Sequence, residues 1–292
     1  MVYDSINELV VGASGRGLCI SDLIIEQQAL ELDCAVPDLN EKMAENLKVM
    51  KEAIDNGVNS ENRSISGLSG GDASKLAKSL EKGVIFGGES LTKILIKALA
   101  VSEVNACMGR IVSAPTAGSC GIIPAVLLTA MEEKNLSEEA IIKGLFTAAG
   151  IGMIIARRAS ISGAEAGCQA ECGSASAMAA GALVEVLGGT PYMVANASAI
   201  ALKNTLGLAC DPVAGLVEIP CIKRNALSAA NALASAVMAL AGIESVIPVD
   251  EVIDAMKSVG DQMPVSLKET AKGGLAATPT GQRLAEEILK KR

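Results

Sequence analysis

Two features limit the chemistry available to this chain: it has no histidine, and three of its eight cysteines, Cys168, Cys210 and Cys221, lie in two distinctive stretches. Cys168 lies in the stretch Gly163-Ala-Glu-Ala-Gly-Cys-Gln-Ala-Glu-Cys-Gly-Ser-Ala, whereas Cys210 and Cys221 lie in Leu208-Ala-Cys-Asp-Pro-Val-Ala-Gly-Leu-Val-Glu-Ile-Pro-Cys-Ile-Lys-Arg-Asn. With no histidine in 292 residues, the chain alone cannot build a Ser-His-Asp triad, a Cys-His nucleophile or a histidine metal site. Thiolates would have to hold any metal, and three thiolates without imidazole favour an iron–sulfur centre.

The spacing of these cysteines does not decide the question by itself. Forty-one residues separate Cys168 from Cys210, ten separate Cys210 from Cys221, and neither interval matches the short ferredoxin spacings. Residues that turn the chain stand beside each thiol: Gly167, Pro212 and Pro220. Such turns expose backbone N–H groups that can donate to cluster sulfurs. Free cysteine is also a small buried hydrophobe, so core packing remains the alternative.

Composition predicts an all-α protein with tightly packed, alanine-rich helices. Half of the residues are hydrophobic, yet only four are aromatic, and β-branched runs are short. We expect an N-terminal helical lobe over residues 1–65 and a helical catalytic domain over residues 66–292, with loops that converge on the cysteines. The net charge of −8, without a basic stripe, argues against a nucleic-acid partner.

Three local patterns predict individual helices. Leu39 to Ile54 carries apolar residues at helical spacing, and Ser137-Glu-Glu-Ala reads as an N-cap followed by an acidic first turn. The uncharged stretch Asn225 to Ile243 is long enough to cross a membrane. Because polar Asn and Ser side chains interrupt it, we interpret it as a buried helix and expect no membrane partner. The first residues lack a signal-peptide pattern, so we expect a reducing cytoplasmic location with free thiols.

Two glycine-rich motifs fail as cofactor sites. Gly12-Ala-Ser-Gly-Arg-Gly reads GxxGxG rather than GxGxxG and has no strand signal before it, which argues against a dinucleotide. Ser69-Gly-Gly-Asp-Ala-Ser-Lys resembles a pyridoxal-phosphate lysine motif, but nothing else supports that interpretation. The same Ser69–Asp72 segment fits a second pocket loop or a surface turn equally well.

The cysteine stretches resemble those of the α chain of iron–sulfur L-serine dehydratases. Asn105-Ala-Cys-Met-Gly-Arg-Ile-Val-Ser-Ala-Pro-Thr-Ala-Gly-Ser-Cys-Gly-Ile-Ile-Pro and Gly273-Gly-Leu-Ala-Ala-Thr-Pro-Thr-Gly are similar to the same family. The resemblance runs from about Ser66 to the C-terminal end and is looser before it. It implies a largely helical chain, an oxygen-sensitive [4Fe–4S] cluster, conversion of L-serine to pyruvate and ammonia, and, in two-chain forms, a β chain as partner.

The resemblance also implies which residues form the site. Cys168, Cys210 and Cys221 are the expected cluster ligands, and Cys172 is expected to pack rather than bind iron. Cys19, Cys34, Cys107 and Cys120 are expected to be structural. Three protein ligands leave one iron of a four-iron cluster open, which suits a Lewis acid.

A loop of small residues is the expected substrate site: Pro115, Thr116, Ala117, Gly118 and Ser119. Backbone N–H groups before a helix N-terminus bind anions, here the serine carboxylate, and Thr116 and Ser119 could add hydroxyl donors. From the residues alone the loop could equally be a helix-entry turn, and the resemblance favours the substrate site.

The general base is not identified by the sequence. Glu165, Glu171, Lys203, Lys223 and Tyr192 are all possible, and a partner chain could supply a histidine. Two rival functions remain: an L-cysteine desulfidase-type lyase that uses the same cluster, and a non-catalytic helical scaffold or membrane protein whose cysteines only pack.

Overall fold

A computed structural model describes residues 3–84 and 86–290. In this part of the chain the secondary structure is helical, and the sole β-type pairing is a single bridge between Cys210 and Lys268. The prediction of an all-α fold is therefore confirmed. The α-helices are α1 (Ile6–Arg16), α2 (Ile20–Glu31), α3 (Val36–Val58), α4 (Asp72–Glu81), α5 (Glu89–Ala106), α6 (Ile122–Lys134), α7 (Glu138–Arg158), α8 (Gly163–Ala166), α9 (Ser174–Val186), α10 (Pro191–Lys203), α11 (Cys221–Leu240), α12 (Val249–Gln262) and α13 (Pro279–Leu289). Short turns are η1 (Ala117–Ser119), η2 (Gln169–Gly173), η3 (Val213–Gly215), η4 (Val265–Leu267) and η5 (Gly274–Ala277).

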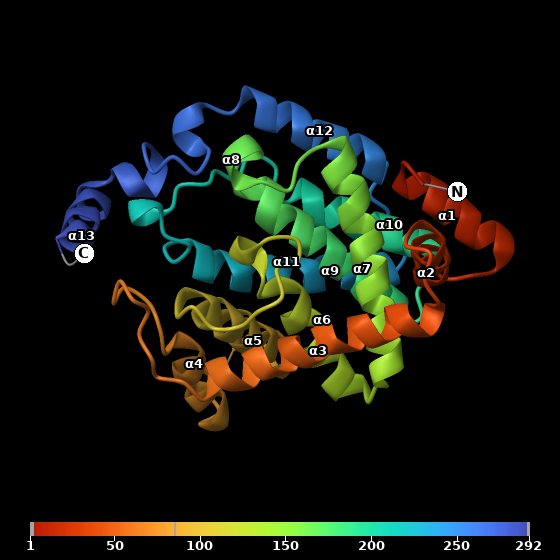
Figure 1. Cartoon of the computed structure of the whole chain (residues 1–292), viewed down its shortest axis with the longest axis horizontal. Coiled ribbons are helices and arrows are strands. Elements are labelled where there is room, and N and C mark those ends of the chain that lie inside the picture. Colours follow the sequence, from red (N-terminus) through yellow and green to blue (C-terminus); the bar gives the residue numbers. More distant parts are fainter. Residues whose placement is uncertain (1–2, 85, 291–292) are drawn as a thin grey trace.

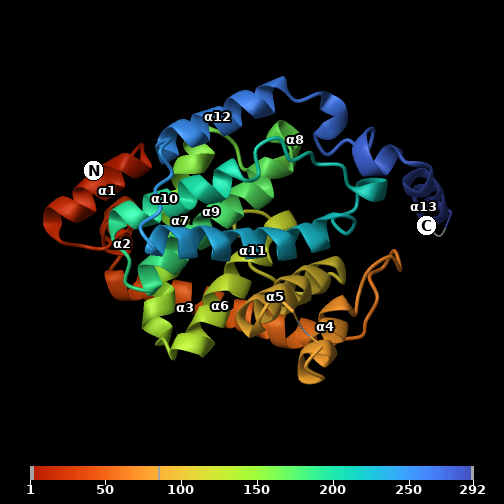
Figure 2. The same ribbon diagram turned by 180° about the vertical axis from the view of Figure 1, so that it is seen from behind.

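Helix α9 forms the centre of the molecule, surrounded by α6, α7, α10 and α11 (Figures 1 and 2). Every residue of α9 from Ser174 to Val184 is buried. Most of these residues are alanine, glycine or serine, so neighbouring helices can approach closely. A Cβ added at Gly181 would lie 2.4 Å from Ile151 Cδ1 of α7. Small side chains, rather than aromatic ones, therefore fill this core.

The outer helices follow the sequence patterns. α3 contains the predicted segment Leu39–Ile54 and packs against α5 and α4. The Ser137 hydroxyl accepts a hydrogen bond from Ala140 N, so the predicted N-cap of α7 is confirmed. The predicted boundary after residue 65 stays a prediction.

The stretch Asn225–Ile243 lies mainly in α11, whose inner face is buried in the protein. Within the described ranges, α7 alone has the length and apolar composition that a membrane span would need, and 61% of that window is buried among other helices.

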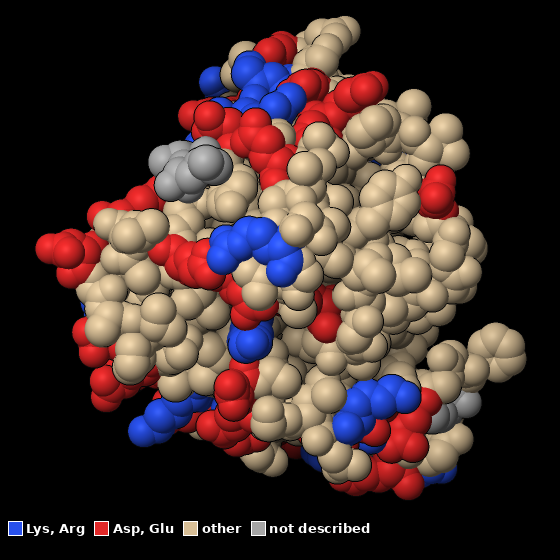
Figure 3. All heavy atoms as spheres, turned by 90° about the vertical axis from the view of Figure 1, so that its right-hand side faces the viewer, with Lys and Arg blue, Asp and Glu red and all other residues tan. Residues whose placement is uncertain are grey.

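Figure 3 shows the face at the α1 end of the molecule. Acidic and basic side chains are interspersed there, and a large area of the face has no charged side chains. No continuous basic stripe crosses this face.

Candidate active site

The first two turns of α11 connect the segments that the sequence analysis singled out. The helix begins at Cys221, directly after Pro220. Lys223 Nζ lies 2.9 Å from Asp72 Oδ2 at the start of α4. Arg224 reaches the Cys210 segment, and Asn225 reaches the predicted substrate loop. The N-terminal end of one helix therefore contacts three separate chain segments.

The three predicted ligand cysteines lie on three different segments, and all are buried. Cys168 precedes the turn η2, Cys221 begins α11, and Cys210 lies in an extended segment. Cys210 N donates to Leu267 O at 2.8 Å, while Cys210 O accepts from Glu269 N at 2.7 Å. This pairing holds the thiol at a fixed place beside the C-terminal region.

The thiols influence one another electrostatically. Burial raises the pKa of Cys221 to about 12, and the charge of Cys168 contributes to the shift. Burial followed by the charge of Cys168 also raises the pKa of Cys210. The pKa of Cys168 is lowered, first by a hydrogen bond with Cys172 (3.4 Å between the Sγ atoms) and further by Arg224. Cys172 is the partner that keeps its proton, because its own pKa is raised.

A half-buried carboxylate lies beside these thiols. Glu171 Oε2 is 3.9 Å from Cys210 Sγ, and burial raises the pKa of Glu171. Two glycines make room for it: a Cβ at Gly163 would lie 2.7 Å from Glu171 Oε2 and 3.0 Å from Cys210 Sγ, and a Cβ at Gly118 would lie 2.9 Å from Glu171 Oε1. The local sequence therefore depends on glycine at both positions.

The predicted substrate loop lies against this carboxylate. Thr116 Oγ1 donates to Glu171 Oε1 at 2.8 Å, and Ser119 is fully buried and lies 3.1 Å from Thr116 Oγ1. In the described part of the chain, the N–H groups of Ala117 and Gly118 donate to no protein acceptor. The loop thus presents two free backbone donors, whereas its Thr116 hydroxyl is already engaged.

Asn225 fixes the same loop from α11. Its Nδ2 donates to Gly118 O at 2.7 Å and to Cys221 O at 3.0 Å, and its Oδ1 accepts from Gly121 N at 2.9 Å. Sequence reasoning missed this role. The signal available was that Asn225 is a polar residue at the start of the uncharged stretch Asn225–Ile243.

A buried ion pair supports the Cys210 segment. Arg224 Nη2 lies 2.9 Å from Asp211 Oδ1, and Arg224 Nη1 donates to Ala209 O at 2.7 Å. Asp211 Oδ2 accepts from Leu275 N at 2.7 Å, which ties the Gly273–Gly281 motif to the same place. The motif near the C-terminal end is therefore part of the site's support.

Of the five candidate bases, the structure brings one to the cysteines, namely Glu171. Glu165 bonds to Ser160, Lys203 donates to Ser245 O, and Lys223 pairs with Asp72. Tyr192 is 54% exposed on α10. Among the described residues, no three Cys, Asp or Glu side chains lie close enough together to bind a single metal ion.

Comparison with known proteins shows similarity over nearly the whole chain. The family model described as "Serine dehydratase alpha chain" matches residues 15–276. The chain is 49% identical over 287 residues to the probable L-serine dehydratase, alpha chain, of Bacillus subtilis, covering 98% of this chain and 95% of that protein. It is 42% identical over 289 residues to the L-serine dehydratase, alpha chain, of Peptoniphilus asaccharolyticus, with 99% of both chains covered. It is also 44% identical over 273 residues to the L-serine dehydratase of Streptomyces coelicolor, covering 92% of this chain and 60% of that protein.

Proposed function

Because the chain belongs to the serine dehydratase alpha-chain family, we propose that it is the α chain of an L-serine dehydratase, a lyase that converts L-serine to pyruvate and ammonia. The observation that carries this proposal is the family match over residues 15–276, together with full-length relatives that are named for this activity. The converging thiols and substrate loop agree with it. The eight cysteines are free, which suits the reducing cytoplasm.

A [4Fe–4S] cluster is the proposed cofactor, with Cys168, Cys210 and Cys221 as its ligands. The fit rests on the donor set: three buried sulfurs from three segments, in a chain that has no imidazole, are the ligand type that iron–sulfur clusters take. When bound, the cluster would supply an electrophilic iron without a protein ligand, which eases departure of the substrate hydroxyl. Neutral buried thiols, such as Cys221, must lose their protons when they become ligands.

The loop Pro115–Ser119 is the proposed site for the substrate carboxylate. The free N–H groups of Ala117 and Gly118 precede α6, and this arrangement suits an anion. Asn225 and Glu171 orient the loop through Gly118 O and Thr116 Oγ1. These contacts tie the loop to α11 and to the turn that follows Cys168, which supports a role for it near the cysteines.

A second chain is the proposed partner. Two relatives of nearly the same length are named alpha chains, and this chain covers only 60% of the Streptomyces enzyme, which is not named as a subunit. A β chain would supply the part that corresponds to the remainder of such an enzyme. It could also supply the histidine that this chain lacks.

Anaerobic copurification of the two chains, followed by iron, sulfide and pyruvate assays, tests the proposal. We expect about four irons and four sulfides per α chain, and pyruvate formation from L-serine. Air exposure should abolish turnover together with the iron. Sulfide release from L-cysteine without pyruvate from L-serine would favour the desulfidase function instead. A fully loaded complex that acts on neither amino acid would refute a lyase function.

A further inference from the structure

Glu218 lies in the segment between Cys210 and Cys221 and is a buried carboxylate, with 7% of its surface exposed. Its backbone carbonyl accepts from Ile222 N at 3.1 Å, so Glu218 enters α11 within one turn of Cys221. No motif in the sequence drew attention to it. Glu218 therefore places a negative charge at the N-terminal end of α11. The proposed ligand Cys221 and the contact of Asn225 with the substrate loop lie at the same end.

Three serine hydroxyls converge on one oxygen of this carboxylate. Ser64, Ser66 and Ser69 donate to Glu218 Oε2 at 2.6, 2.9 and 2.6 Å. The hydroxyls come from one loop, Ser60–Gly71, which we name the serine loop. Three donors on a single oxygen fix the orientation of the carboxylate, and they leave its other oxygen, Oε1, without a donor in the described part of the chain. Oε1 is not sealed from solvent.

Glu218 also lacks a cationic partner among the described residues. The nearby basic side chains are engaged elsewhere: Lys223 pairs with Asp72, Arg224 pairs with Asp211, and Arg63 donates to Gly67 O and Gly70 O. A buried charge is ordinarily paired with an opposite charge. Glu218 is therefore a buried carboxylate without a counter-charge among the described residues.

The other acidic groups of this region have their oxygens in use. Both oxygens of Glu103 accept backbone N–H groups at the start of α4, from Asp72 at 2.7 Å and from Ala73 at 3.3 Å. Glu171 bonds to Thr116 and lies beside Cys210. Among these acidic groups, Glu218 is therefore the buried carboxylate with an oxygen, Oε1, that accepts no hydrogen bond within the described part of the chain.

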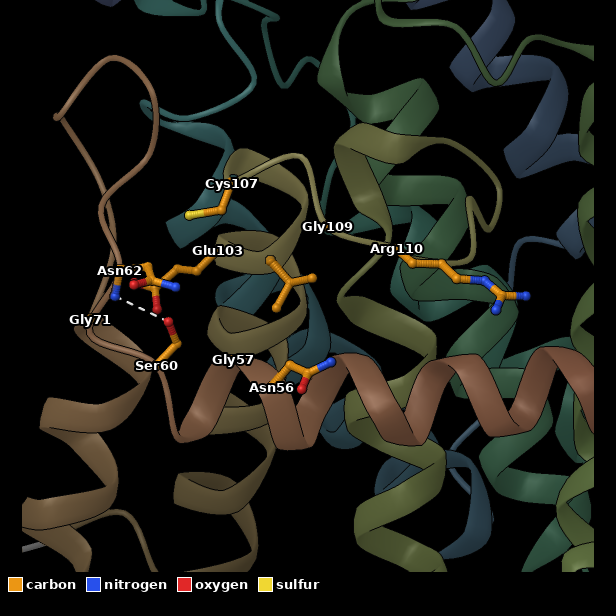
Figure 4. A pocket seen from close by; sticks show the side chains of 10 residues that line it. Asn56, Gly57, Ser60, Asn62, Gly71, Glu103, Cys107, Gly109 and Arg110 are labelled. Carbon is orange, nitrogen blue, oxygen red and sulfur yellow. Dashed lines mark hydrogen bonds between the residues drawn. The ribbon is translucent and has the colours of Figure 1, made fainter.

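Figure 4 shows a pocket that residues of the serine loop line. A pocket of about 220 Å³ lies between Ser60, Asn62 and Gly71 of the loop and Glu103 and Cys107 at the end of α5. Burial, and then the charges of Glu103 and Glu218, raises the pKa of Cys107. Arg110 also lines the pocket, but its side chain points away from Glu103 and Cys107 (Figure 4). The charges that act on Cys107 are those of Glu103 and Glu218, and they favour a cationic ligand group on this side of the pocket.

We propose that Glu218 binds the α-ammonium group of the amino-acid substrate through Oε1, in an orientation set by Ser64, Ser66 and Ser69. This inference rests on the proposed function, because it assumes an amino-acid substrate beside Cys221. The loop Pro115–Ser119 would hold the carboxylate of the substrate, and Glu218 would hold its ammonium. The two contacts together would distinguish an amino acid from a hydroxy acid.

The test compares ligands with and without the amino group on the assembled two-chain enzyme. In Glu218→Gln the KM for L-serine should rise about tenfold or more, as loss of one charged hydrogen bond requires. The inhibition constant of 3-hydroxypropanoate, which has no amino group, should change less than about twofold. Ser66→Ala, which removes one orienting hydroxyl, should raise KM less. Glu251→Gln, at an exposed position on α12, is the matched control.

Three outcomes would overturn the inference. If both ligands weaken equally in Glu218→Gln, the residue only supports the structure. If KM is unchanged, Glu218 does not touch the substrate. If iron is lost with the substitution, Glu218 holds Cys221 in place instead. Failure of the unsubstituted enzyme to turn over L-serine would instead refute the proposed function, before any variant is compared.

Discussion

Thr116 Oγ1 donates a hydrogen bond to Glu171 Oε1 at 2.8 Å, so the proposed substrate loop is tied to the turn that follows Cys168. Thr116→Val keeps the side-chain shape but removes the donor, leaving an oxygen of the half-buried Glu171 carboxylate without this hydrogen bond. We expect a loss of about 1–3 kcal/mol in unfolding free energy and a higher KM for L-serine. Thr116→Ser keeps the hydroxyl and should retain the native values. Denaturant unfolding and steady-state kinetics check this, and a Val variant equal to the native enzyme would contradict it.

Substitution of single cysteines tests the proposed ligand set. Cys168→Ser, Cys210→Ser and Cys221→Ser should each abolish cluster retention, measured as iron and sulfide per chain after anaerobic purification. Cys172→Ser is the matched control, because Cys172 is equally buried and its Sγ lies 3.4 Å from Cys168 Sγ. It should keep the iron. Loss of iron from Cys172→Ser alone would show that the ligand set is wrong.

Sequence alone predicted the fold class and several helices because those depend on local signals. Alanine-rich, periodic segments indicated helices. The Ser137 cap could be predicted because its hydrogen bond joins residues only three positions apart in the chain. The Thr116–Glu171 and Asn225–Gly118 bonds join residues far apart in the chain. No pattern within one segment encodes such pairs, so Glu171 stayed one of several possible bases, and Asn225 was interpreted only as a polar interruption of an uncharged stretch. Glu218 was missed for the same reason, since its three serine partners lie about 150 residues earlier.

Gly163 is required by close packing rather than by backbone conformation. A Cβ there would lie 2.7 Å from Glu171 Oε2 and 3.0 Å from Cys210 Sγ. Gly163→Ala should therefore displace Cys210, cost about 1–3 kcal/mol, and lower the iron content. Gly15→Ala is the control, because nothing lies within 4 Å of its Cβ and alanine favours the helix α1. Equal iron content in the two variants would show that Cys210 tolerates the added methyl group.

Asn225 and Asn231 allow a matched comparison on one helix. Asn225 binds the substrate loop, whereas Asn231 Nδ2 donates to Ser176 Oγ and to Ala201 O, both at 2.9 Å, and so contacts α9 and α10. Each change to alanine should lower the unfolding free energy by about 2 kcal/mol. Only Asn225→Ala should also raise the KM for L-serine. A similar rise in both variants would mean that KM follows general stability rather than the loop.

Lys97 offers a stability test away from the site. Its side chain on α5 is 9% exposed and lies 2.6 Å from Glu132 Oε2, whose side chain is 56% exposed. Burial lowers the pKa of Lys97, so at neutral pH the folded protein keeps a charge that the surroundings disfavour. Lys97→Met should therefore be neutral or stabilising, by up to about 1 kcal/mol at pH 7.

The pH dependence of this difference follows from the direction of the pKa shift. Between the lowered pKa of Lys97 in the folded state and the ordinary lysine pKa of 10.5, the unfolded chain binds more protons, so native stability rises with pH. The methionine variant lacks this gain, and its advantage should shrink as pH rises through that window. Denaturant unfolding of both proteins at pH 7 and at alkaline pH measures it, with Lys257→Met, an exposed site on α12, as the control. An advantage that grows with pH would show that the Glu132 ion pair, rather than burial, determines the energetics of Lys97.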